Sequence, residues 1–186
     1  DEFSFSSQVT NDLDFSNVSN LENLDFNGTN NSVTYGSDEV SAGVTDITLG
    51  TGTDNFNLDF SNIGSLNNVN GEAGTDTITL SNYNNATVTN ALNNVFDNME
   101  ELTLANNSTF TIDSEVINSW RDSGNSTFTI SGSGGDTVNI TTNDSSYSWS
   151  SDGTNWNTGD ISDAAGTYYI DTDNSIASTD ITLQVI

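Results

Sequence analysis

Three segments of the chain combine glycines with one aspartate in a spacing that suits a bound calcium ion. They partly match the nonapeptide G-G-x-G-x-D-x-U-x, in which U is a large apolar residue. In this pattern glycine lets backbone carbonyl groups turn toward a hard cation, the aspartate supplies negative charge, and the apolar residue points into the core. The matching residues are Gly50, Gly52, Asp54 and Phe56; Gly71, Gly74, Asp76 and Ile78; and Gly132, Gly134, Asp136 and Val138.

These matches predict calcium ligands at Asp54, Asp76 and Asp136, with the glycines forming the surrounding turns. Consecutive nonapeptides normally stack so that neighbouring turns share each ion, whereas these aspartates lie 22 and 60 residues apart. The alternative interpretation is a glycine turn between two strands, capped by the aspartate and holding no ion.

A second candidate site consists of aromatic residues in the C-terminal part of the chain. Asp152-Gly153 favours a type I′ turn, and counting outward from it pairs Trp149 with Trp156 across a hairpin. Together with Tyr147, the two indoles could form a platform for sugar rings. Cross-strand tryptophan pairs also stabilise hairpins without binding any ligand, so a sugar-binding role and a purely structural role both stay open.

The composition excludes most other chemistry. The chain has no His, Cys or Pro, and Arg121 is its one basic residue, so imidazole, thiolate and lysine nucleophiles and zinc-type ligand sets are excluded. A net charge of −26 disfavours binding to nucleic acid or anionic lipid and favours a cation as ligand. Carboxylate pairs are plentiful, but in so acidic a chain we expect them to be solvated, and we expect no enzymatic activity.

An internal repeat is the strongest sign of how the chain is organised. Residues 13–18 (LDFSNV) recur as residues 58–63 (LDFSNI), 45 residues later. Residues 21–26 resemble residues 99–104, and residues 48–54 resemble residues 129–136. Repeats of this kind predict rungs that stack on one another, with Phe15 and Phe60 at equivalent inward positions.

The local patterns predict short strands separated by turns. Alternating polar and β-branched or apolar residues mark strands at 77–80, 101–104, 109–112, 127–130 and 137–140. Two short helices are expected, one around residues 91–96 and one around residues 116–120 capped by Ser114. The predicted fold is all-β: an elongated β-solenoid over residues 1–142, with an antiparallel cap over residues 143–186. A β-sandwich is the alternative.

The arrangement of these segments resembles a module of very large bacterial surface proteins. Met99-Glu100-Glu101-Leu102, a short helix, the Gly-Gly-Asp-Thr-Val of residues 134–138 and the ending Leu183-Gln184-Val185 are similar to units of repeats-in-toxin-type adhesins and surface-layer proteins of Gram-negative bacteria, which are exported by type I secretion.

The resemblance implies an extracellular, calcium-stabilised, non-catalytic role in cell adhesion, a surface layer or an extracellular filament. The expected partners are other copies or modules of the same surface protein. The alternative is a glycan-binding adhesin domain that uses the aromatic hairpin.

Overall fold

The computed structural model describes residues 1–105, 108–122, 126–132, 136–142, 148–151, 157, 160–161, 166–171 and 181–186. Strands dominate these residues, so the all-β class is confirmed. In this part of the chain four short helical segments lie between strands: α1 (Ser37–Ala42), α2 (Ser114–Trp120) and the 3-10 turns η1 (Phe60–Ser65) and η2 (Asn90–Leu92).

The strands of the described residues form two large and two small sheets. The five-stranded sheet contains β1 (Glu2–Phe5), β2 (Asn23–Phe26), β4 (Asp46–Thr48), β7 (Asn68–Asn70) and β11 (Phe96–Asp97), in that order. The eight-stranded sheet has the order β3 (Ser32–Tyr35), β6 (Asn55–Asp59), β9 (Thr77–Ser81), β12 (Glu101–Leu104), β14 (Thr127–Gly132), β18 (Ile181–Val185), β17 (Gly166–Asp171) and β16 (Ser148–Ser150). The smaller sheets contain β10 (Ala86–Val88), β13 (Thr109–Asp113) and β15 (Thr137–Thr141), and β5 (Thr51–Gly52) with β8 (Ala73–Gly74).

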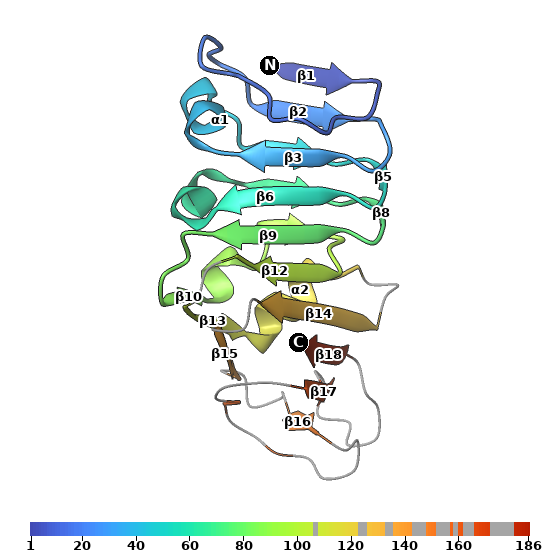
Figure 1. Cartoon of the computed structure of the whole chain (residues 1–186), viewed down its shortest axis with the longest axis vertical. Helices are drawn as coiled ribbons and strands as arrows, with labels where there is room; N and C mark the ends of the chain where they lie inside the picture. The colour runs from blue at the N-terminus through green and yellow to red at the C-terminus, as the bar shows by residue number, and fades with distance from the viewer. Residues whose placement is uncertain are drawn as a thin grey trace.

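The chain passes from one sheet to the next and returns about 22 residues later to pair in parallel with its previous pass. Asn55 of β6 is in register with Ser32 of β3 and with Thr77 of β9. In the five-stranded sheet, Asp46 is in register with Asn23 and Asn68. Figure 1 shows β3, β6, β9, β12 and β14 stacked along the long axis of the molecule. We call each such pass a circuit.

The 45-residue repeat corresponds to two circuits. Asp14 and Asp59 occupy the same local turn, because each accepts a hydrogen bond through Oδ1 from the backbone N–H two residues on, at 2.9 and 3.0 Å. Phe15 is buried and Phe60 is half-buried, and both pack against the core. The 78-residue repeat does not mark equivalent positions: residues 23–26 lie in the five-stranded sheet and residues 101–104 in the eight-stranded one.

Alternating side chains fill the space between the sheets. Because successive strand residues face opposite sides, each circuit places two or three apolar residues directly over those of the circuit before. Phe56, Ile78 and Leu102 form one such column, and all three have no exposed surface. Edge-to-face contact between Phe96 and Trp120, with ring centroids 4.7 Å apart, continues the core toward α2.

The helix at residues 116–120 is confirmed, with a different cap. Asp113 is the N-cap, and its side chain accepts the N–H of Glu115 at 3.1 Å, so Ser114 is already the first helical residue. The other expected helix is only the short 3-10 turn η2, after which Phe96 begins strand β11. The helix α1 has no counterpart among the sequence predictions.

Antiparallel pairing is confined, among the named strands, to β17, which lies between β16 and β18. The strand β18 itself pairs in parallel with β14 and so joins this part to the stack. The predicted pairing of Trp149 with Trp156 is wrong: Trp149 bridges to Asn157, with reciprocal hydrogen bonds of 2.9 and 2.8 Å. The predicted turn at Asp152-Gly153 lies outside the described residues. The domain boundary at residue 143 stays a prediction.

Candidate functional site: a column of buried acidic side chains

One polar residue stands directly before each of four successive strands of the eight-stranded sheet. Asn31, Asp54, Asp76 and Glu100 precede β3, β6, β9 and β12, and only 0–4% of each residue is exposed. Their separations of 23, 22 and 24 residues equal one circuit each. These four residues therefore form a single column, which we call the acidic column.

Each member of the acidic column accepts a backbone N–H from the preceding circuit. The N–H of Val9 donates to Asn31 Oδ1 at 2.9 Å, and the N–H of Asn31 donates to Asp54 Oδ1. In the same way Asp54 N–H donates to Asp76 Oδ1 and Asp76 N–H donates to Glu100 Oε2, both at 2.8 Å. A buried backbone N–H at a strand corner needs an acceptor, and these side chains supply it.

The second polar atom of each side chain distinguishes the amide from the acids. Asn31 Nδ2 donates to the carbonyl oxygens of Gly28, at 3.1 Å, and Leu49, at 2.7 Å. The corresponding atoms of Asp54 and Asp76 are Oδ2, and both are buried without a hydrogen-bond partner. A carboxylate oxygen left in this state costs free energy unless it is protonated or meets a cation.

Burial changes the acidity of the column accordingly. Desolvation raises the pKa of Asp76 to about 7, and the negative charges of Asp54 and Glu100 act in the same direction. Desolvation also raises the pKa of Asp54 and of Glu100, and for Glu100 the charge of Asp122 adds to the effect. A proton or a metal cation bound at the column would reduce the free-energy cost of burying these negative charges.

The glycines of the first two calcium motifs lie where adjacent circuits approach most closely. A Cβ atom on Gly50 would lie 2.2 Å from the carbonyl oxygen of Phe26, and one on Gly74 would lie 1.5 Å from that of Gly52. Gly52 and Gly74 are register partners in the small β5–β8 pair. Backbone stacking therefore requires glycine at these positions whether or not an ion is bound. The 22-residue spacing of Asp54 and Asp76 is one circuit, so these two motifs are stacked neighbours.

The third motif lies in a separate column at the three-stranded sheet. Asn85 N–H donates to Ser108 Oγ at 2.9 Å, and Ser108 N–H donates to Asp136 Oδ1 at 3.1 Å. The hydroxyl of Tyr83 also donates to Asp136 Oδ1. We call Asn85, Ser108 and Asp136 the neutral-rich column. A Cβ on Gly132 would lie 2.7 Å from Asp136 Oδ2, and Gly134 lies outside the described residues.

The structure thus brings Asp54 and Asp76 together and separates Asp136 from them. Within the residues that it describes, no three His, Cys, Asp or Glu side chains converge as a ready-made metal-ligand group. Calcium binding stays a prediction, now focused on Asp54 and Asp76.

No sequence motif indicated that Asn31, Glu100 or Glu39 belongs to a site. Their position in the chain could have identified two of them. Asn31 and Glu100 each directly precede a strand of alternating polar and apolar residues, one circuit away from the neighbouring member of the column. Glu39 is a further buried acid, outside the column, whose Oε2 accepts the N–H of Gly36 at 2.7 Å while Oε1 has no hydrogen-bond partner. Desolvation raises the pKa of Glu39 to about 7.

The aromatic candidate site is only partly covered by the described residues. Tyr147 and Trp156 lie outside them. Trp149 is half-buried, packs against the core and meets the ring of Tyr168 edge-on at 5.8 Å between centroids. Sugar binding by this region stays a prediction.

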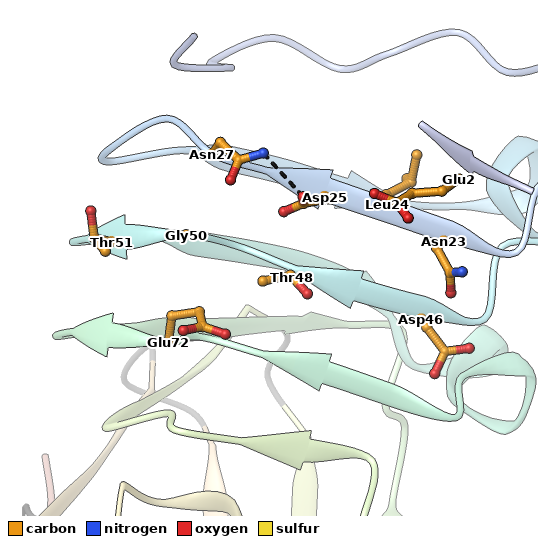
Figure 2. Close-up of a pocket in the computed structure, with 10 residues that line it drawn as sticks. All are labelled: Glu2, Asn23, Leu24, Asp25, Asn27, Asp46, Thr48, Gly50, Thr51 and Glu72. Carbon is orange, nitrogen blue, oxygen red and sulfur yellow. Dashed lines mark hydrogen bonds between the residues drawn. The ribbon is translucent and has the colours of Figure 1, made fainter. Parts of the chain in front are cut away.

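An open hollow lies on the outward side of the five-stranded sheet. Its lining includes the carboxyl groups of Glu2, Asp25, Asp46 and Glu72, as Figure 2 shows. Asn27 Nδ2 donates to Asp25 Oδ2 at 3.0 Å. These acids are solvent-accessible, unlike those of the acidic column, so they can be hydrated without a bound ion.

Comparison with protein-family models, with curated proteins and with solved structures finds no match for this chain. No helix among the described residues is long and apolar enough to cross a membrane.

Proposed function

We propose that the chain is a β-solenoid that acts as a non-catalytic structural module of an extracellular bacterial surface protein. Successive parallel circuits, each burying its apolar side chains on the next, support the solenoid over the β-sandwich alternative. An array of this kind gives a stiff spacer or adhesive element whose length grows with the number of circuits.

A non-catalytic role is supported by how the buried acids are used. Asp54, Asp76 and Glu100 each accept a hydrogen bond from a backbone N–H through one carboxylate oxygen. Groups held in this way inside the stack are placed to hold the circuits together rather than to meet a substrate.

The observation that carries the proposal is the pair of unpartnered oxygens, Asp54 Oδ2 and Asp76 Oδ2, inside the acidic column. Calcium bound there would neutralise charge in a chain of net charge −26. A ligand that binds only the folded state stabilises it by about 2.7 kcal/mol at a hundredfold excess over Kd. Calcium is abundant outside cells and scarce inside them, so the module would become fully stable only after export.

Thermal unfolding in calcium and in chelator, at matched ionic strength, tests the proposal. We expect the melting temperature to rise in calcium and to rise much less in magnesium, which prefers a smaller octahedral site. Equal melting temperatures in calcium and chelator would contradict the calcium-dependent part. An equal shift with magnesium would instead indicate general screening of the surface charge.

A further inference from the structure

The two large sheets present outward faces of very different charge. On the eight-stranded sheet, strands β3, β6, β9, β12 and β14 align ten outward positions in two columns. These are Ser32, Asn55, Thr77, Glu101 and Thr129, and Thr34, Asn57, Thr79, Thr103 and Ser131. All ten side chains are half-exposed, and only Glu101 is charged. We call this surface the hydroxyl–amide face.

The five-stranded sheet has the opposite character. Its outward columns are Glu2, Asn23, Asp46 and Asn68, and Ser4, Asp25, Thr48, Asn70 and Asp97. Four of these nine residues are acidic, and Glu72 lies beside them in the hollow of Figure 2. Two copies of the molecule would repel each other across this surface.

The hydroxyl–amide face is also held in a fixed arrangement by its own hydrogen bonds. Thr79 Oγ1 donates to Asn55 Oδ1 at 2.9 Å, and the hydroxyl groups of Thr103 and Ser131 lie 3.1 Å apart. Thr77 Oγ1 donates to Glu101 Oε2 at 3.2 Å, which fixes the position of the one carboxylate among these ten residues. Because these side chains are already ordered, a partner that binds here loses little side-chain entropy.

Parallel, in-register strands that carry columns of Ser, Thr and Asn can pack tightly against an identical sheet. In such interfaces the side chains of two facing sheets interdigitate, and amide columns add hydrogen bonds along the stack. Figure 1 shows β3, β6 and β9 on the side turned toward the viewer, with no helix in front of them. The ten residues of this face carry one carboxylate, and Asp59 at the end of β6 adds a second beside them. In a chain of net charge −26, a second copy therefore meets less repulsion here than across the five-stranded sheet.

We propose that the hydroxyl–amide face is a self-association surface whose partner is the same face of a second copy of this chain. The proposal rests on the structural role put forward above and names the surface through which copies assemble. A face that meets its own copy gives a closed two-fold dimer. Raising the ionic strength strengthens the dimer, because salt screens the repulsion between the remaining acidic surfaces.

Sedimentation velocity over a range of protein and salt concentrations tests the proposal with a matched pair of variants. Asn57→Asp places a nearly isosteric charge on β6 within the hydroxyl–amide face, while Asn68→Asp places the same charge on the five-stranded sheet. We expect the wild type and Asn68→Asp to dimerise alike. We expect Asn57→Asp, which introduces two facing charges per dimer, to raise the dissociation constant at least about tenfold. Thr79→Asp gives a second test on the neighbouring strand, and circular dichroism checks that each variant is folded.

Three results would overturn the proposal. The wild type could stay monomeric at every protein and salt concentration. This result would count against self-association even if the wild type also bound an immobilised neutral polysaccharide. The Asn68→Asp variant could weaken association as much as Asn57→Asp does. Folded Asn57→Asp and Thr79→Asp could both dimerise like the wild type. None of these results alters the calcium-dependent melting of the monomer, so the structural role is tested separately.

Discussion

The acidic column and the neutral-rich column meet the same backbone requirement with different chemistry. In both, a side chain directly before a strand accepts an N–H from the preceding circuit. In the neutral-rich column Ser108 accepts the N–H of Asn85 through its hydroxyl oxygen, and the one acid, Asp136, receives the Tyr83 hydroxyl as a second donor to the same oxygen. The acidic column places three acids in succession and leaves Asp54 Oδ2 and Asp76 Oδ2 unpartnered.

The two columns differ in how much charge they carry beyond what the backbone requires. Asn31 shows that a neutral amide satisfies this corner completely, through one accepted and two donated hydrogen bonds. The charge on Asp54 and Asp76 is therefore more than the backbone requires. We infer that this excess charge serves a cation.

The largest effect is expected at the glycine corner beside the acidic column. Gly50 has a φ of +92°, and a Cβ there would lie 2.2 and 2.6 Å from two backbone oxygens that have no room to move. We expect Gly50→Ala to lower the free energy of unfolding by about 3 kcal/mol or more in urea denaturation. Gly132→Ala, at the other column, should cost about 1–2 kcal/mol because its nearest atoms belong to the side chain of Asp136.

Gly64→Ala serves as the control for both glycine changes. Nothing lies within 4 Å of a Cβ at this position in η1. We expect a change within about 0.5 kcal/mol. A loss at Gly64 as large as that at Gly50 would mean that close circuit stacking is not what requires glycine.

A smaller effect is expected when the neutral acceptor of each column is removed. Asn31→Ala leaves the N–H of Val9 and the carbonyl oxygens of Gly28 and Leu49 without this partner in a buried setting, and should cost about 2–3 kcal/mol. Ser108→Ala affects only the exposed Asn85 and should cost about 1 kcal/mol or less. Equal losses in urea denaturation would mean that burial does not distinguish the columns.

The smallest effect concerns Glu39, a buried acid outside both columns. Its pKa of about 7 in the folded state lies above its ordinary value of 4.5. Protonated Glu39 therefore favours the folded state, and this contribution is complete below pH 4.5 and is lost as the pH rises to about 7. In Glu39→Gln, the decline in melting temperature between pH 4.5 and 7 should be shallower than in the wild type. An identical pH profile would show that Glu39 does not titrate in this range.

Much of the fold could be predicted from local patterns. The strands at 77–80, 101–104, 109–112, 127–130 and 137–140 are all present, because alternation and β-branched residues report directly on a half-buried strand. The circuit length could not be recognised from the 45-residue repeat alone. The intermediate circuit carries Tyr35-Gly36-Ser37-Asp38 at the equivalent turn and forms α1 instead, so its sequence conceals the 22-residue period.

The candidate site was predicted for a reason that proved incomplete. Glycine–aspartate spacing identified Asp54, Asp76 and Asp136, but these patterns reflect strand corners as well as ion sites. What places Asp54 beside Asp76 is the register between β6 and β9, which depends on contacts far apart in the sequence. For the same reason Asn31 and Glu100 gave no local signal.

The acidic column as a cation site is tested most directly by Asp76→Asn, with Asp25→Asn on the outward face as the control. The melting temperature of each protein is measured at neutral pH in calcium and in chelator. We predict that calcium raises the melting temperature of the wild type and of Asp25→Asn, and that Asp76→Asn shows no calcium response while melting above the wild type in chelator. A calcium response of equal size in Asp76→Asn and the wild type, or none in any of the three proteins, would contradict the acidic column as a calcium site.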